Sequence, residues 1–194
     1  MDLALFRAAL PRGDLWVYGY GSLMWSPGFP FRDHSVGLLR GYHRALCILS
    51  TRYRGTDRRP GLVMGLCRGG SCWGMAFRVP AAQVARTLSR LWHREMRRHV
   101  YRAKLVPVRI SRGRRIRALA FIADPGHPQY RRELDLHSRA QLVAQGVGAR
   151  GRCTDYIRHT LEHMYEVGVT DPHLARVLET AEAIRARAPS RRTR

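Results

Sequence analysis

Long apolar runs are absent from this chain of 194 residues. No stretch approaches the roughly 18 consecutive apolar residues that a membrane-spanning helix needs. The opening segment, MDLALFRAALPRGD, is interrupted by Asp2, Arg7 and Arg12, which is not the pattern of a secretory signal. We therefore expect a cytoplasmic protein. The length and a hydrophobic content of 45% predict a single domain over residues 1–185, followed by a disordered basic tail over 186–194.

Cysteine is scarce, and its spacing is not that of a metal site. The chain has 4 cysteines, at Cys47, Cys67, Cys72 and Cys153. They do not form the paired motifs typical of zinc sites, so no metal is expected from them. In a cytosolic protein we expect all of them to be reduced and partly buried. Cys67 and Cys72 could also face each other across a turn at Gly69 and Gly70.

Acidic residues and lysine are also rare. The chain carries 35 Lys and Arg against 14 Asp and Glu, for a net charge of +21, and Lys104 is the only lysine. Such a basic surface attracts anions, either nucleic acid or a small acidic peptide. No nucleic-acid-binding motif is recognisable, and the aromatics are not interleaved with arginine in a repeat. A nucleic-acid-binding domain stays as the alternative from another class, with nonspecific binding at most.

The pattern of apolar residues predicts an α+β fold. Strands are expected at 15–18, 41–49, 62–67, 72–79, 100–110 and 116–123. Segment 68–71 is interpreted as a hairpin turn, 50–61 as a polar loop and 31–40 as irregular or edge-like. Helices are expected at about 80–98, 129–145, 152–167 and 171–187, with 2–10 either a short helix or a lead-in. Together these elements predict a mostly antiparallel sheet closed into a small barrel, with helices around it.

The stretch Tyr18-Gly19-Tyr20-Gly21-Ser22-Leu23-Met24-Trp25 follows the first expected strand. Glycines on both sides of a tyrosine allow the backbone to turn sharply and approach a ligand. Successive N–H groups in such a turn can form a nest for a negatively charged oxygen. From these residues alone, an ordinary strand-to-loop turn remains the other interpretation.

The segment YGYGSLMWSPGF resembles the substrate-binding motif of the ChaC family of γ-glutamylcyclotransferases. Further segments resemble the same family in the same order: GYHRAL, STRYRGTDRRPGLVMGL, GGSCWGMAFRV, LWHREM, FIADPGHPQY and GVGARGRCTDYIRHTL. Together they span most of residues 16–175. One departure is Tyr53, where the family pattern leads us to expect a histidine. The resemblance implies the γ-glutamylcyclotransferase-like barrel, and substrate binding by Gly19, Tyr20, Gly21, Ser22, Leu23 and Met24.

Glu95 is one of only two acidic residues between Asp33 and Asp124; the other is Asp57. At about 100° per residue, Glu95 falls near the middle of the apolar stripe of its helix. Such a carboxylate is either part of a structural ion pair, for instance with Arg94, or an acid–base group in a cleft. The resemblance favours the second reading, because the family carries its catalytic glutamate in an Arg-Glu pair.

The reaction that the resemblance implies is cleavage of glutathione to 5-oxo-L-proline and cysteinylglycine. The substrate's α-amine attacks its own γ-carbonyl carbon, so no protein nucleophile, metal or cofactor is required. Glu95 is the expected general acid/base. Other γ-glutamyl peptides or amines are alternative substrates.

Four further features of the chain are weaker candidates. Arg44 could meet a substrate carboxylate or lie on the surface, and Tyr130 could contact substrate or belong to the core. The H-x-x-E-H pattern at 159–163 has no evident third zinc ligand. The G-x-G-x-x-G pattern at 146–151 is interpreted as a joint between helices, because no strand is expected before it.

Overall fold

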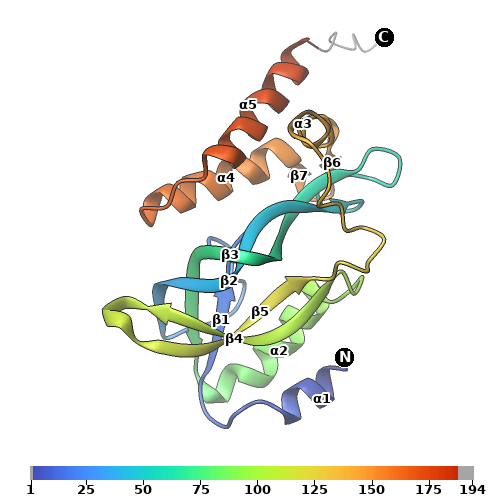
Figure 1. The fold of residues 1–194 in the computed structure, drawn as a ribbon. Helices are drawn as coiled ribbons and strands as arrows, with labels where there is room; N and C mark the ends of the chain where they lie inside the picture. The colour runs from blue at the N-terminus through green and yellow to red at the C-terminus, as the bar shows by residue number, and fades with distance from the viewer. Residues whose placement is uncertain (1, 188–194) are drawn as a thin grey trace. The chain divides into compact units, whose positions relative to one another are not determined.

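The computed structural model describes residues 2–187. Its five long strands form a closed barrel in the order β1-β3-β2-β4-β5 (Figure 1). Their bounds are Leu15–Gly19 for β1, Asp33–Ser50 for β2, Gly61–Val79 for β3, Tyr101–Ile110 for β4 and Arg115–Ala123 for β5. The helices are α1 Leu3–Ala8, α2 Ala81–Glu95, η1 Ser111–Gly113, α3 Leu136–Gln145, α4 Cys153–Glu166 and α5 Pro172–Arg187. The predicted α+β fold with a small barrel is confirmed.

Most neighbouring strands of the barrel are antiparallel. Strand β1 pairs with β3 from Leu15 opposite Val79 onward. Strand β4 pairs with β5, with only the turn η1 between them. Parallel pairing of β5 with both β1 and β3 closes the sheet. Every strand contributes buried apolar residues, among them Val17, Leu39, Leu66, Val108 and Leu119.

The predicted hairpin over residues 62–79 is wrong. Residues 61–79 form one continuous strand, β3, which passes through the glycine pair without reversing. Gly69 and Gly70 both adopt positive φ, of 96° and 68°. The two glycines therefore give a local irregularity within a strand that pairs with β1, β2 and β5.

The irregular segment predicted at 31–40 is also largely a strand. Strand β2 begins at Asp33 and pairs with β4 through Gly37, Leu38 and Leu39. Gly37 is the local reason that this pairing is possible, because a Cβ there would lie 2.7 Å from Cγ1 of Val108. The edge-like appearance of the segment comes from its exposed polar start rather than from a missing partner.

The three helices after β5 agree in number and approximate position with those predicted from the sequence. Helix α3 begins at Leu136 instead of 129, because Asp135 caps it by accepting a hydrogen bond from the N–H of Ser138 at 2.7 Å. The G-x-G-x-x-G segment forms two short paired strands, β6 Val147–Gly148 and β7 Gly151–Arg152. No helix within residues 2–187 is long and apolar enough to cross a membrane.

The chain divides into two compact units. The first comprises Met1–Ala45 and Met64–Tyr130, and the second comprises Leu46–Val63 and Arg131–Arg194. Strand β2 carries the chain from the first unit into the second, and β3 brings it back. Most of the predicted tail at 186–194 lies outside the described residues, since α5 ends at Arg187.

All four cysteines are buried thiols, and none forms a disulfide. Cys153 donates a hydrogen bond from Sγ to the carbonyl of Leu62 at 2.9 Å, and its sulfur accepts one from the N–H of the same residue at 3.4 Å. Burial is the main cause that raises the pKa of the Cys153 thiol to about 12. The hypothesis that Cys67 and Cys72 face each other across a hairpin has no basis, because residues 61–79 form one strand.

The start of α2 is held by an acidic residue from before β1. Pro80 precedes the helix and has no side-chain group that could cap it. Instead, the carboxylate of Asp14 accepts a hydrogen bond from the N–H of Ala81 at 2.9 Å and pairs with Arg78 at 2.8 Å. The bond from Ala81 is the main reason that the pKa of Asp14 is lowered. This contact fixes the start of α2 relative to β1 and β3.

Tyr18 is buried in β1 and packs against Gly74 of β3. Its hydroxyl donates a hydrogen bond to the carbonyl of Cys72 at 2.7 Å. A Cβ on Gly74 would lie 2.8 Å from that hydroxyl and 2.3 Å from the carbonyl oxygen of Gly19. Burial raises the pKa of Tyr18, so the hydroxyl stays protonated and remains a donor. Only glycine therefore fits at position 74.

We predict that Gly74→Ala lowers the free energy of unfolding by about 3 kcal/mol, because the new methyl group meets backbone that cannot move aside. Chemical denaturation of the two proteins measures this difference. Gly126→Ala is the control, since its Cβ would lie 3.6 Å from the nearest heavy atom, on Asp124. Equal stability of the two variants would contradict the packing described here.

Candidate active site

The glycine-rich stretch forms a tight turn directly after β1. The N–H of Met24 donates to the carbonyl of Gly21 at 2.8 Å, and the N–H of Ser26 donates to the carbonyl of Ser22 at 2.9 Å. The N–H groups of Gly21, Ser22 and Leu23 take no part in these two bonds. Residues 19–24 are buried apart from the half-buried Ser22. These three N–H groups are among those expected from the sequence to face a negatively charged oxygen.

Gly19 is required because the turn folds back onto the end of its own strand. A Cβ on Gly19 would lie 2.9 Å from Cβ of Leu23, 3.0 Å from its carbonyl carbon and 3.2 Å from the amide nitrogen of Met24. Those distances are shorter than ordinary van der Waals contact. The glycine thus provides space for the turn.

Two anchors hold the turn against the barrel. Tyr20 is buried, and its hydroxyl donates to the carbonyl of Phe121 in β5 at 2.7 Å. Arg44 of β2 donates through Nε to the carbonyl of Tyr20 at 2.5 Å and through Nη2 to the carbonyl of Trp73 at 2.6 Å. Its Nη2 also lies 3.7 Å from Sδ of Met24. Arg44 therefore supports the turn from the sheet, a role that the sequence did not suggest.

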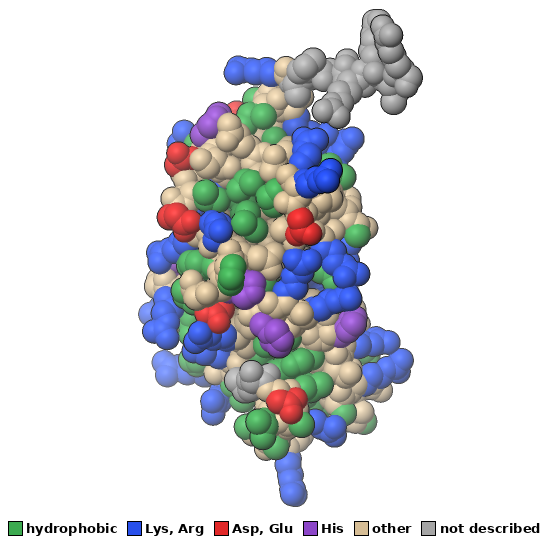
Figure 2. Space-filling model, turned by 90° about the vertical axis from the view of Figure 1, so that its right-hand side faces the viewer, with side chains coloured by type: hydrophobic (Ala, Val, Ile, Leu, Met, Phe, Trp, Pro, Cys, Tyr) green, Lys and Arg blue, Asp and Glu red, His purple; other side chains and the backbone are tan. Residues whose placement is uncertain are grey.

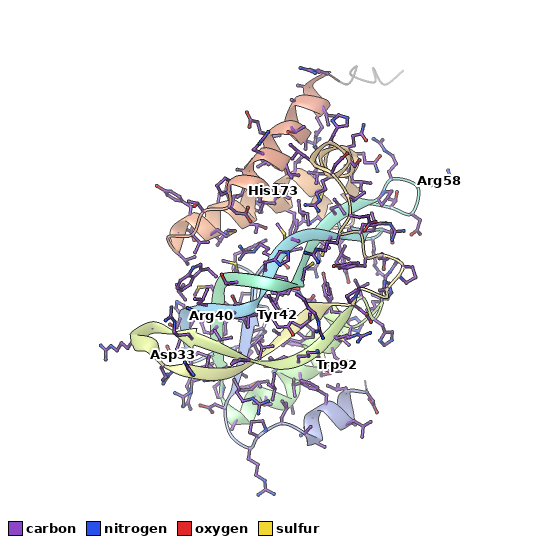
Figure 3. All side chains as sticks on the ribbon, viewed as in Figure 1. Asp33, Arg40, Tyr42, Arg58, Trp92 and His173 are labelled. Carbon is purple, nitrogen blue, oxygen red and sulfur yellow. The ribbon has the colours of Figure 1, made fainter. Side chains whose placement is uncertain are left out.

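Glu95 is the last residue of α2, and its side chain is only 17% exposed. It lies on the face that the helix buries, four residues after the buried Leu91 and eight residues after the buried Thr87. Figure 3 labels Trp92, which lies in the same last turn of the helix. The C-terminal end of a helix carries partial negative charge, which disfavours an ionised carboxylate there. A compensating cation is therefore expected beside Glu95.

Arg94 is that cation, and it also joins the helix to the turn. Its Nε lies 2.9 Å from Oε1 of Glu95. Its Nη2 donates to Oγ of Ser22 at 2.8 Å, and its Nη1 donates to the carbonyl of Ser26 at 2.6 Å. Its side chain is 18% exposed, so solvent screens these contacts only partly. One guanidinium thus places the carboxylate of Glu95 next to the turn at Ser22.

The ion pair proposed from the sequence as one interpretation of Glu95 is therefore present, and it lies at the glycine-rich turn. What the sequence did not reveal is that Arg94 also binds Ser22 and Ser26. The only available signal was that Arg94 precedes Glu95 in the helix.

The remaining sequence candidates lie elsewhere or have other contacts. The hydroxyl of Tyr130 donates to Sγ of Cys67 at 3.5 Å. In the H-x-x-E-H segment, Nδ1 of His163 is 2.8 Å from the carbonyl oxygen of His159, within helix α4. The G-x-G-x-x-G segment holds the loop after β2, because the N–H of Ala149 donates to the carbonyl of Arg52 at 2.8 Å.

Comparison with known proteins places this chain in a family. The model of the ChaC-like protein family matches residues 15–184. The glutathione-specific γ-glutamylcyclotransferase of Escherichia coli is 34% identical over 186 residues, covering 95% of this chain and 80% of the relative. The human glutathione-specific γ-glutamylcyclotransferase 1 is 33% identical, covering 89% and 82% of the two chains.

Solved structures show the same fold. The crystal structure of a yeast γ-glutamylcyclotransferase specific to glutathione superposes with a TM-score of 0.83, covering 90% of this chain and 98% of the yeast chain at 18% identity. With the family model matching nearly the whole chain and relatives above 30% identity, the protein belongs to the ChaC-like family.

Proposed function

We propose that this protein is a γ-glutamylcyclotransferase that cleaves glutathione into 5-oxo-L-proline and cysteinylglycine, a lyase activity. Membership of the ChaC-like family supports this, as do the glutathione-specific relatives from bacteria and animals. The structural observation that carries the proposal is the guanidinium of Arg94, which contacts both Glu95 and Ser22. It brings an acid–base group beside a turn suited to a negatively charged substrate.

In the proposed reaction, Glu95 removes a proton from the substrate's α-ammonium group. The free amine attacks the γ-carbonyl carbon, forming the new C–N bond and a tetrahedral centre whose oxygen carries the negative charge. The old amide C–N bond then breaks, the carbonyl re-forms as part of the five-membered lactam, and the departing nitrogen takes the proton from Glu95. The carboxylate next accepts the second proton that the ring nitrogen must lose and passes it to the released amine, so that cysteinylglycine leaves with an ammonium group. Atoms and charges balance without a cofactor or metal, and the carboxylate is regenerated.

The turn at residues 19–24 is proposed to hold the substrate for this attack. An extended γ-glutamyl chain keeps the amine away from its own carbonyl, so the folded form must be fixed by binding. The N–H groups of Gly21, Ser22 and Leu23 would bind the α-carboxylate of the substrate or stabilise the oxyanion. The same chemistry suits other γ-glutamyl peptides and amines, which compete with glutathione as candidate substrates.

We also propose that the protein works in the cytoplasm. Its four cysteines are buried thiols, which suits a reducing compartment.

We predict that Glu95→Gln lowers the rate of 5-oxoproline formation by about a hundredfold or more, because an amide cannot accept the proton. Release of 5-oxoproline and cysteinylglycine from glutathione measures the loss, and γ-glutamyl dipeptides test substrate preference in the same assay. Glu162→Gln is the matched control, since Glu162 is exposed on α4. Near-normal turnover in folded Glu95→Gln protein would remove Glu95 as the base.

Arg94 gives a second prediction, as a positioning residue. In Arg94→Gln we expect kcat/KM to fall by about tenfold or more, because the charge-assisted bonds to Glu95 and Ser22 are lost. Without the neighbouring cation the carboxylate is more easily protonated, so the acidic limb of the pH–rate profile should move to higher pH.

Profiles recorded from about pH 5 to pH 9 check this shift. Arg90→Gln is the control, because Arg90 lies on the same helix and donates to the carbonyl of Gly28 at 3.2 Å without an ion pair to a carboxylate. An acidic limb that stays in place in Arg94→Gln would show that Arg94 does not act on the catalytic carboxylate.

A further inference from the structure

The hairpin formed by β4, η1 and β5 carries an unusual density of arginine. Five of the nine residues from 109 to 117 are arginines: Arg109, Arg112, Arg114, Arg115 and Arg117. All five are exposed. In Figure 1 the tip of this hairpin lies at the left of the view, away from α1 and α2 of the same compact unit. We call these five residues the arginine ribbon.

The strand register brings like charges into opposition on the ribbon. Arg109 of β4 stands directly opposite Arg115 of β5, and the next exposed pair is Pro107 with Arg117. Two like charges facing each other across antiparallel strands destabilise a sheet. The repulsion between these side chains destabilises the hairpin. An anion bound between them would reduce that repulsion.

Carboxylate partners are absent from the ribbon, although the chain uses them elsewhere. Within residues 2–187, none of the five arginines has an Asp or Glu oxygen within 4.0 Å. By contrast, Arg102 on the same strand β4 pairs with Asp124 at 2.9 Å. Arg114 lies over the ring of Trp16 at 5.4 Å. The other four project into solvent with their charge uncompensated.

Figure 2 shows another face of the protein, on which Lys and Arg side chains also outnumber acidic ones, so positive charge is not confined to the ribbon. A net charge of +21 attracts polyanions to any face of the protein. What distinguishes the ribbon is that its positive charges are concentrated on two paired strands. Arginines of the ribbon should therefore contribute more to the affinity for a polyanion than arginines elsewhere on the surface.

We propose that the arginine ribbon binds the phosphodiester backbone of nucleic acid without sequence preference. The planar guanidinium group donates two parallel hydrogen bonds to a phosphate, which favours arginine over lysine for this contact. A two-stranded ribbon is also narrow enough to enter the major groove of a duplex. This inference is independent of the proposed enzymatic function, because none of the five arginines belongs to the candidate active site.

The chemistry of the hairpin favours nucleic acid over a lipid surface. An element that lies on a membrane normally inserts large apolar side chains beside its basic ones. The tip, Ser111-Arg112-Gly113-Arg114, has none. The large hydrophobic residues that are exposed lie elsewhere in the chain, at Leu5, Phe31, Trp73, Val147 and Tyr165.

The first test measures binding of the full chain to a fluorescent DNA duplex of about 20 base pairs, between about 50 and 200 mM salt. If the four uncompensated arginines each neutralise one phosphate, the logarithm of the association constant falls with the logarithm of salt with a slope of about −3.6. The triple variant Arg109→Gln, Arg115→Gln, Arg117→Gln should bind at least about tenfold more weakly, with the slope reduced in size by about 2.7.

A matched triple variant removes the same charge from elsewhere: Arg86→Gln, Arg97→Gln, Arg176→Gln, all at exposed positions on or beside helices. It should keep most of the affinity and of the slope. Equal losses in the two triple variants would overturn the proposal, since binding would then follow net charge alone. So would the absence of saturable binding by the wild-type chain at the lowest salt.

The single variant Arg115→Glu separates binding from folding. It places a carboxylate opposite Arg109, so the melting temperature should rise while affinity for the duplex falls. Turnover of glutathione should be unchanged in the ribbon variants. The binding measurements do not depend on that activity, so they test the ribbon even if the proposed enzymatic function is wrong. Ribbon-dependent binding to phosphatidylglycerol vesicles, without binding to the duplex, would assign the surface to membranes and overturn the proposal.

Discussion

The candidate active site depends on one shared guanidinium. Arg94 joins the last turn of α2 to the turn after β1, and its three nitrogens bind a carboxylate, a hydroxyl and a backbone carbonyl. Only arginine has a planar group with donors pointing in several fixed directions. Glu95 stands at the unfavourable end of a helix dipole, so this cation also offsets the local negative charge. Arg94 therefore contributes to both the position and the electrostatics of the carboxylate.

The barrel supplies the other half of the site by making the turn rigid. Tyr18, Tyr20 and Arg44 each direct a side-chain donor at a backbone carbonyl of the turn or of the strands beside it. Such bonds fix the backbone without using its N–H groups, which are the groups that a substrate would need. Preorganised donors of this kind do not have to reorient during a reaction, and for that reason they stabilise developing charge well.

Much of this arrangement could be predicted from local patterns. Alternating apolar residues predicted the β4–β5 hairpin, and helical periodicity placed Glu95 on the buried face of α2. The hairpin predicted around Gly69 and Gly70 was wrong because glycine pairs suit both a reversal and an irregularity within a strand. The contacts of Arg44 and Arg94 could not be predicted, because each bridges residues distant in sequence and nothing local sets them apart from the other arginines.

The burial of the thiols has a consequence for a protein proposed to handle glutathione. Its substrate pool also contains the oxidised disulfide, which forms mixed disulfides with accessible thiolates by exchange. Cys153 has a pKa raised to about 12, and the other three cysteines are equally shielded from solvent. Because exchange requires a thiolate that can reach the disulfide, the protein should resist S-glutathionylation even when the pool becomes oxidised.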